Sequence, residues 1–558
     1  MNKDSKRLIV FIIVSFVILF GFNKIYGPKP QASQPVQSTP AVVPAGTAAV
    51  SATSQAAAST DSSLPFSLGT AREIKEVDSE GHTVETPLVS VTFSNIGGVI
   101  QSYKLKAYTD TKDGEKLPVE LVPNNTSFSY LALNSSSMEL FGNTWKFDGE
   151  TRTSSGITVA FKKDFNTGLE VRRSYTLQYD SYLIDMKISF INRTGAPFPL
   201  KDFQLLWGPN IHRLPGDAAK MKDSIYAYNK ATYPTGKGAK HITVSIDPKK
   251  KDAKTTIIPE ITPWLAYHDS YFTASFLLKE LSKIKNTFAK ETGGGFGYLG
   301  INFSDTIISA GMQENFELSA FIGPKEYKRL KKAGGMQKMV DLGWIRELGI
   351  GMFYLMDFLY GATKNYGVAI LLITLIIRGL LFIPSQKSYK HMKETQKKMN
   401  IIKPRMETLK KIYKDDPKKM NEETMKLYQE YKINPLGGCL PMLLQLPIFI
   451  ALYQTLISMV ELKGANFALW LKDLSRPDPF YVLPLFMGAT MFIQQKMTVQ
   501  PAMSPEQEQQ QKIMLYGMPI FLTFISFQWP SGLLLYWSAS NLFGIVQQMI
   551  VNKSTTDK

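Results

Sequence analysis

Apolar residues are concentrated in long runs near the two ends of the chain, and the region between these runs is polar. One run covers residues 8–22, and others follow at residues 352–383, 436–460, 480–495, 513–529 and 532–551. Most of them approach the roughly 20 residues that a membrane-spanning helix requires. The pattern predicts a polytopic α-helical membrane protein with six spans.

The first apolar run follows a short basic segment that contains Lys3, Lys6 and Arg7. A cleaved signal peptide begins in the same way, but no small-residue cleavage site follows this run. We therefore expect residues 1–26 to form an uncleaved transmembrane anchor. Residues 27–64 are rich in Pro, Ala and Ser and have few bulky apolar side chains, which is typical of a disordered linker.

Residues 65–335 contain short segments in which apolar and polar residues alternate, for example 88–93, 156–161 and 182–190. Clusters of Asn, Gly, Asp and Pro separate these segments. A period of two with such breaks predicts antiparallel strands. We expect one large all-β sandwich domain here.

The pattern becomes helical after the strands. Residues 336–351 predict an amphipathic helix at the membrane surface, although a plain connector helix fits the same pattern. We expect the second span at 352–384, where the first half, with Asp357 and Lys364, either crosses the membrane or lies in its interface. We expect spans three to six within 435–551 and a short tail at 552–558. Pro484 lies inside the short run 480–495, which predicts a tilted or kinked helix there.

A basic segment, residues 385–434, separates the second and third spans. It carries fourteen Lys or Arg residues against seven acidic residues, and a short loop of this composition belongs in the cytoplasm. This placement puts both termini in the cytoplasm and the β-domain on the opposite side. Apolar residues recur at helical spacing on both sides of Asp415-Asp416-Pro417, which predicts a helical hairpin. Its apolar face either closes the hairpin or binds a partner.

One arginine, Arg378, lies inside an apolar run. A charged side chain at the centre of a membrane helix costs about 2.5–3.5 kcal/mol on insertion scales, so it normally faces protein or water. Thr374 lies one turn earlier on the same helical face. Two interpretations stay open: the pair lines a polar cavity, or Arg378 extends to the lipid headgroups from near the helix end.

Composition and candidate chemistry restrict the function further. The formal net charge of +17 suits anionic lipid, nucleic acid or acidic partners. The single cysteine, Cys439, excludes an intrachain disulfide, and the five histidines show no metal-ligand spacing. No nucleophile–base pair is visible, so we expect neither a metal, a cofactor nor an enzyme.

Several motifs in the second half of the chain are distinctive. They are Ile376-Ile377-Arg378-Gly379, Asn434-Pro435-Leu436-Gly437-Gly438-Cys439, Phe467-Ala468-Leu469-Trp470, Asp478-Pro479 and Trp529-Pro530-Ser531-Gly532. In this order they resemble the YidC-type membrane protein insertases of Gram-negative bacteria, within the Oxa/Alb superfamily. The resemblance implies a bacterial inner-membrane protein with a five-helix insertase core and a periplasmic β-domain. One departure is Tyr536-Trp537, where the family commonly has two tyrosines.

The resemblance also implies a function and a site. Family members insert inner-membrane proteins and help them fold, alone or with the Sec translocon, through a hydrophilic, positively charged groove in the membrane. Arg378 would lie in that groove. The other residues that the resemblance and the polar pattern place there are Thr374, Gln445, Ser526, Tyr536, Trp537 and Ser538. The serines fit ordinary helix–helix packing equally well.

The expected partners follow from the same resemblance. They are nascent inner-membrane proteins, the Sec translocon, anionic phospholipids and, through the cytoplasmic hairpin, the ribosome; DNA is not expected. The short tail weakens the case for a ribosome contact. A solute transporter or an anion channel that uses Arg378 as its binding charge is the alternative, and an anchored carbohydrate-processing enzyme is a third interpretation.

Overall fold

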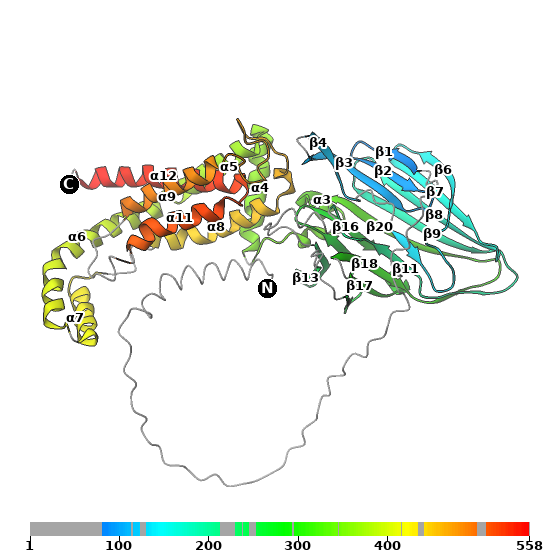
Figure 1. Cartoon of the computed structure of the whole chain (residues 1–558), viewed down its shortest axis with the longest axis horizontal. Coiled ribbons are helices and arrows are strands. Elements are labelled where there is room, and N and C mark those ends of the chain that lie inside the picture. The colour runs from blue at the N-terminus through cyan, green and yellow to red at the C-terminus, as the bar shows by residue number, and fades with distance from the viewer. Residues whose placement is uncertain are drawn as a thin grey trace, which may run out of the picture.

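The computed structural model separates the chain into a β-domain and a bundle of helices that lie end to end (Figure 1). It describes residues 81–112, 115–122, 130–212, 229–236, 238–244, 253–292, 295–343, 345–414, 416–433, 440–498, 509 and 511–556. The expected anchor at 1–26 and linker at 27–64 lie outside the described residues.

The β-domain consists of sheets in which every neighbouring pair of strands is antiparallel. The largest has nine strands in the order β13-β12-β15-β16-β20-β9-β8-β7-β6, and smaller sheets have the orders β14-β17-β18-β11-β5, β1-β2-β3-β4 and β10-β19. The strands are β1 (Gly81–Glu85), β2 (Val89–Ser94), β3 (Ile100–Lys112), β4 (Glu115–Glu120), β5 (Ala132–Asn134), β6 (Lys146–Arg152), β7 (Gly156–Asp164), β8 (Leu169–Gln178), β9 (Leu183–Asn192), β10 (Phe198–Leu200), β11 (Gln204–Trp207), β12 (Asn229–Pro234), β13 (Ala239–Val244), β14 (Lys254–Ile258), β15 (Trp264–His268), β16 (Phe272–Leu278), β17 (Ile284–Thr292), β18 (Phe296–Phe303), β19 (Thr306–Ile308) and β20 (Gln313–Pro324).

Aromatic side chains join the smaller sheets to the nine-stranded sheet. Phe190 on β9 meets Phe203 with ring centroids 5.0 Å apart, and Phe303 on β18 meets Phe316 on β20 at 4.9 Å. Phe93 on β2 packs 4.7 Å from Tyr175 on β8. These aromatic side chains are all buried where the sheets face each other, and the predicted β-sandwich domain is therefore confirmed.

The segment after β20 corrects the prediction of an interfacial helix at 336–351. The chain forms a short helix, α3 (Tyr327–Lys332), and a single 3-10 turn, η2 (Met336–Met339). Gly334 and Gly335, which follow α3, adopt left-handed backbone angles with φ of 98° and 74° that end this helix, and Val340 ends η2 in an extended conformation. Met336 and Met339 are fully buried in the core that continues from the β-domain. The apolar pattern of this segment therefore reflects packing against protein.

The bundle contains α4 (Arg346–Thr363), α5 (Tyr366–Leu380), α6 (Phe382–Ile412), α7 (Pro417–Glu430), α8 (Leu440–Ser458), η4 (Val460–Leu462), α9 (Val482–Thr498), η5 (Ile513–Gly517), α11 (Met518–Ser526) and α12 (Ser531–Thr556). Among the described helices, none by itself is both long and apolar enough to cross a membrane. The bent pair of Tyr366–Leu380 and Phe382–Leu409 meets that test by length and composition, with an angle of 57° between its parts.

The helices in two of the apolar runs differ from a single kinked or continuous helix. Residues 352–384 do not form one helix, because Lys364 ends α4 with a left-handed φ of 55° and the Asn365 side chain caps α5 by accepting from the Val368 N–H at 3.2 Å. Pro484 does not interrupt a helix. It lies in the first turn of α9, where a proline removes no helical hydrogen bond.

The basic segment forms the predicted hairpin from α6 and α7. Asp416 caps α7 by accepting from the Lys419 N–H at 3.1 Å, and Pro417 occupies its first turn. The buried seam between the helices contains Met399, Ile402, Met406, Leu427, Tyr428 and Ile433. The apolar face therefore mainly closes the hairpin, although Ile401, Ile412 and Met425 remain exposed.

The β-domain and the bundle meet through a lysine that we call the docking lysine, Lys463. Its ammonium lies 2.5 Å from Asp110 on β3, over the rings of Tyr271 and Phe272, and its side chain is only 4% exposed. His212 lies 2.7 Å from the same carboxylate. Burial alone would raise the pKa of Asp110, but His212 and Lys463 hold it well below its usual range.

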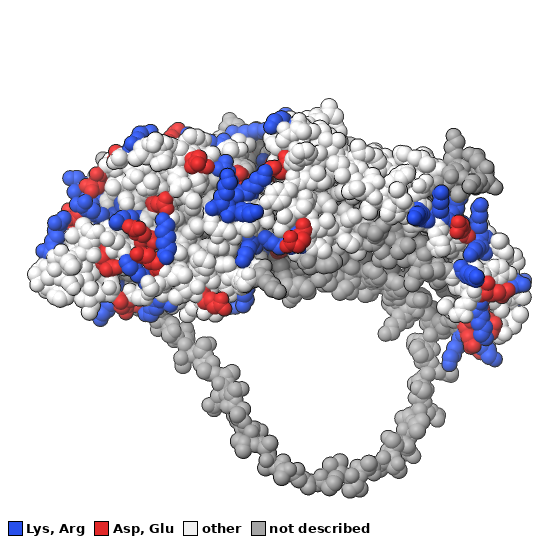
Figure 2. Space-filling view, turned by 180° about the vertical axis from the view of Figure 1, so that it is seen from behind, with Lys and Arg blue, Asp and Glu red and all other residues white. Residues whose placement is uncertain are grey.

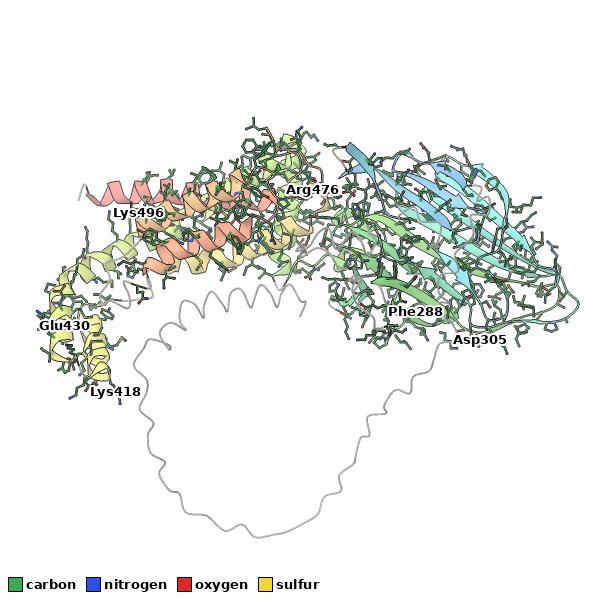
Figure 3. All side chains as sticks on the ribbon, in the orientation of Figure 1. Phe288, Asp305, Lys418, Glu430, Arg476 and Lys496 are labelled. Atoms are coloured by element: carbon green, nitrogen blue, oxygen red, sulfur yellow. The ribbon has the colours of Figure 1, made fainter. Side chains whose placement is uncertain are left out.

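The loop that carries Lys463 also holds the start of α12. The Ser531 N–H donates to the Arg476 carbonyl at 2.8 Å, and the Gly532 N–H donates to the Leu474 carbonyl at 2.9 Å. Figure 3 places Arg476 at the end of the bundle nearest the β-domain and Lys496 near the opposite end. The β-domain is thus connected to α12, the helix that carries Tyr536, Trp537 and Ser538 of the predicted site.

Candidate functional site

Arg378 occupies the last turn of α5 and turns its guanidinium toward α12. Its Nε and Nη2 donate to the Ser540 hydroxyl at 3.1 and 2.6 Å. This arrangement favours the interpretation in which the arginine faces protein. Among the described residues, Arg378 forms no ion pair with a carboxylate, so Ser540 solvates the charge without neutralising it.

Gln445 on α8 meets the same hydroxyl. Its Nε2 donates to Ser540 Oγ at 3.2 Å, and Ser540 is 1% exposed. Side chains from α5, α8 and α12 therefore converge on one buried oxygen. We call Arg378, Gln445 and Ser540 the polar cluster.

The hydroxyl groups of Thr374, Ser526 and Ser538 do not join the polar cluster. Thr374 donates to the Ile370 carbonyl at 2.6 Å and Ser526 to the Thr523 carbonyl at 2.8 Å, each within its own helix. This pairing satisfies a buried hydroxyl without reaching a neighbour. The Ser538 hydroxyl is buried and has no hydrogen-bond partner within the described part of the chain.

The aromatic pair on α12 lies on the β-domain side of Ser540. Tyr536 is 2% exposed. Trp537 stacks on Trp529, with centroids 5.6 Å apart, and meets Phe449 of α8 edge-on at 4.7 Å. Trp537 is therefore packed between Trp529, at the turn before α12, and Phe449 of α8.

Sequence reasoning identified Arg378 and Gln445 but missed Ser540, the residue that joins them. The available signal was spacing: Ser540 lies one helical turn after Tyr536 on the same face. Two further buried amides on α12 were also missed. Gln547 donates to the Phe382 carbonyl at 2.9 Å and Gln548 to the Met497 carbonyl at 2.7 Å.

Charged side chains are distributed in zones along the molecule. Figure 2 shows a face of the bundle with few charged residues, between the β-domain and a hairpin that carries many of both signs. On the hairpin some cations are paired, as in Arg405 with Glu430 at 3.0 Å and Lys426 with Glu423 at 2.7 Å. Within the described residues, no group of three or more His, Cys, Asp or Glu side chains could hold a metal ion.

Two family models match the chain and divide it between them. The model described as "YidC periplasmic domain" matches residues 82–355, and the model described as "60Kd inner membrane protein" matches residues 358–558. These matches confirm the resemblance that the sequence motifs indicated.

Full-length relatives agree with the family models. The chain is 31% identical to the membrane protein insertase YidC of Syntrophus aciditrophicus and 33% identical to that of Geotalea daltonii, and each comparison covers 99% of this chain and 99% of the relative. A solved structure titled as an active YidC insertase with its first transmembrane domain resolved is 19% identical, with a TM-score of 0.35, over 85% of this chain and 93% of that one. The two family models and the full-length relatives show that the chain belongs to the YidC family of membrane protein insertases, whose members are not enzymes.

Proposed function

We propose that this chain inserts nascent inner-membrane proteins into the bilayer and helps them fold, alone or with the Sec translocon. The observation that carries the proposal is the polar cluster, in which a guanidinium without a carboxylate partner among the described residues lies between apolar helices. Family membership supports insertion over the solute transporter or anion channel that the sequence left open.

The charge of Arg378 determines what the site attracts. A buried cation in a partly water-filled groove lowers the cost of moving an acidic segment part of the way into the bilayer. The apolar helix of the client then leaves sideways into lipid, driven by about 25 cal/mol per Å² of apolar surface removed from water. The other groove residues that we propose are Thr374, Ser526, Tyr536, Trp537 and Ser538.

The same proposal includes the topology. We propose six spans with both termini in the cytoplasm and the β-domain in the periplasm. The hairpin and the C-terminal end of α12 lie at the end of the bundle opposite the β-domain (Figure 1), which supports this arrangement. The basic hairpin would then meet anionic phospholipids and the ribosome on the cytoplasmic side.

The proposal is tested by depleting the protein in its host and supplying wild type, Arg378→Ala or Arg378→Lys. The measurement is protease accessibility of a two-span client whose translocated tail is acidic, with a neutral-tailed client as the control. We expect Arg378→Lys to restore insertion, and Arg378→Ala to fail for the acidic tail while still inserting the neutral one. Insertion of both clients during depletion would overturn the insertase proposal. Full rescue by Arg378→Ala would overturn the role of the charge.

A further inference from the structure

The helix that carries Arg378 breaks immediately after the polar cluster. α5 ends at Leu380 and α6 begins at Phe382, with a bend of 57°. The cause is local: Pro384 lacks the N–H that would bond to the Leu380 carbonyl, and its ring clashes with that carbonyl. The break lies between the residues that form the site and the long helix that leads to the basic hairpin.

α12 contacts both sides of this break through one face. Ser540 accepts from Arg378 in the last turn of α5, and Gln547 donates to the carbonyl of Phe382 at the start of α6. The two α12 residues are seven positions apart, which is about two turns and about 10 Å along one side of a helix. Gln547 is 5% exposed, so its amide is committed to this contact.

The neighbouring glutamine, Gln548, forms its hydrogen bond with a different helix. Gln548 is 2% exposed and donates to the Met497 carbonyl at the end of α9. Adjacent residues on α12 thus make the same kind of amide-to-carbonyl bond to two different helices. Of these two bonds, the one from Gln547 joins α12 to α6, on the far side of the break.

We propose that Gln547 is a positioning residue, and that with Ser540 it makes α12 a splint across the α5–α6 break. The splint sets the angle between the helix that presents Arg378 and the helix that carries the hairpin. The inference rests on the proposed function for its effect on insertion, but the geometry can be tested separately. Without Gln547, side-chain packing alone would fix the angle between α5 and α6, and the break at Pro384 would act as a hinge.

The test compares Gln547→Leu with Gln548→Leu in the full chain. Cys439→Ser removes the native thiol. Two exposed nitroxide sites are supplied by Lys418→Cys on α7, which is labelled in Figure 3, and by Leu485→Cys on α9, which lies more than three turns from Met497. Double electron–electron resonance in lipid nanodiscs then gives the distance distribution between the hairpin and the bundle. Insertion of the acidic-tailed client is measured in parallel.

We expect Gln547→Leu to broaden the distance distribution and to slow insertion several-fold, while Gln548→Leu keeps the narrow wild-type distribution. Gln547→Lys retains a donor for the Phe382 carbonyl and should restore the narrow distribution. Equal broadening in both leucine variants, or none in Gln547→Leu, would overturn the splint. Broadening with unchanged insertion would overturn only its role in insertion, and Arg378→Ala in the same assay shows whether the insertase proposal itself has failed.

Discussion

His241 and His268 share a buried pocket in the part of the β-domain nearest the bundle. The Thr232 hydroxyl lies 2.8 Å from a ring nitrogen of each. Lys325 donates to the Asp269 carbonyl at 3.0 Å and lies 3.3 Å from His268 Nδ1. Burial of the rings and the nearby positive charge of Lys325 both disfavour protonation of the imidazoles.

The pKa values follow from this pocket. Burial and then the charge of Lys230 lower the pKa of His241 to about 4, while Asp341 opposes the shift. Burial and then Lys325 hold the pKa of His268 well below its usual range. The unfolded chain therefore binds protons below about pH 6.5, where the folded chain does not, and stability falls as the pH drops from there toward 4.

We expect the free energy of unfolding of the β-domain to be lower at pH 4.5 than at pH 7.5. His241 alone contributes on the order of 3 kcal/mol across its full window. Denaturant titration of the detergent-solubilised protein, followed by tryptophan fluorescence, measures the difference. His241→Gln should reduce the pH dependence, because it removes the buried imidazole whose pKa is lowered. A wild-type protein that is equally stable at both pH values would contradict the assignment.

At the level of single residues, only part of the candidate site could be predicted from the sequence. Arg378 was identifiable because a guanidinium inside an apolar run is costly. Ser540 was not, because a serine in a membrane helix usually serves helix packing. Its partner lies 162 residues away in the chain, and only the fold brings the two together.

The first turn of α5 packs tightly against the loop after α8. A Cβ added to Gly367 would lie 2.0 Å from a ring carbon of Phe467. The Phe467 carbonyl accepts from the Asn365 side chain at 2.9 Å, and Asn365 in turn caps α5. The glycine therefore permits a contact that also positions the helix cap.

This contact reverses the usual effect of replacing a helical glycine with alanine. Helix propensity alone favours alanine by about 1 kcal/mol, but the clash at Gly367 should make Gly367→Ala destabilising by about 1–3 kcal/mol. Gly351→Ala in α4, where nothing lies within 4 Å of the added Cβ, should stabilise instead. Thermal unfolding in detergent distinguishes the two. A stabilised Gly367→Ala would show that the loop is not seated on α5.

Helices and strands whose apolar residues recur at a regular spacing were predictable from the sequence. Segments whose conformation depends on packing against another part of the chain were not. Strand β9 and the hairpin cap at Asp416 follow from alternation and turn chemistry. The segment that contains Met336 and Met339 has a helix-like apolar pattern, but its side chains are buried in the core shared with the β-domain. Periodicity reports that a side chain is buried and does not report what buries it.

At the scale of the whole molecule, the docking lysine determines how the β-domain is held. Lys463→Met removes the ammonium from Asp110, Tyr271 and Phe272. We expect a loss of about 2 kcal/mol in the docked state. Hydrogen exchange in β3 and in the loop that contains Lys463 should therefore accelerate about 30-fold.

Lys472→Met is the matched control, because Lys472 is an exposed lysine in the same loop. It should leave hydrogen exchange in β3 unchanged. Equal protection in both variants would mean that the apolar core across the junction is sufficient and that the lysine adds nothing. Selective acceleration in Lys463→Met assigns the docking to this one side chain.

The separation of Lys463 from Asp110 along the chain imposes an order on biogenesis. The two residues are 353 positions apart, and at about 5–20 residues per second a ribosome needs roughly 20–70 seconds to make the segment between them. The acidic and aromatic groups that receive the lysine are therefore synthesised, exported and available to fold well before the lysine exists. Until Lys463 has been synthesised, Asp110, Tyr271 and Phe272 lack the ammonium that docks the β-domain on the bundle, so docking follows the synthesis of the bundle.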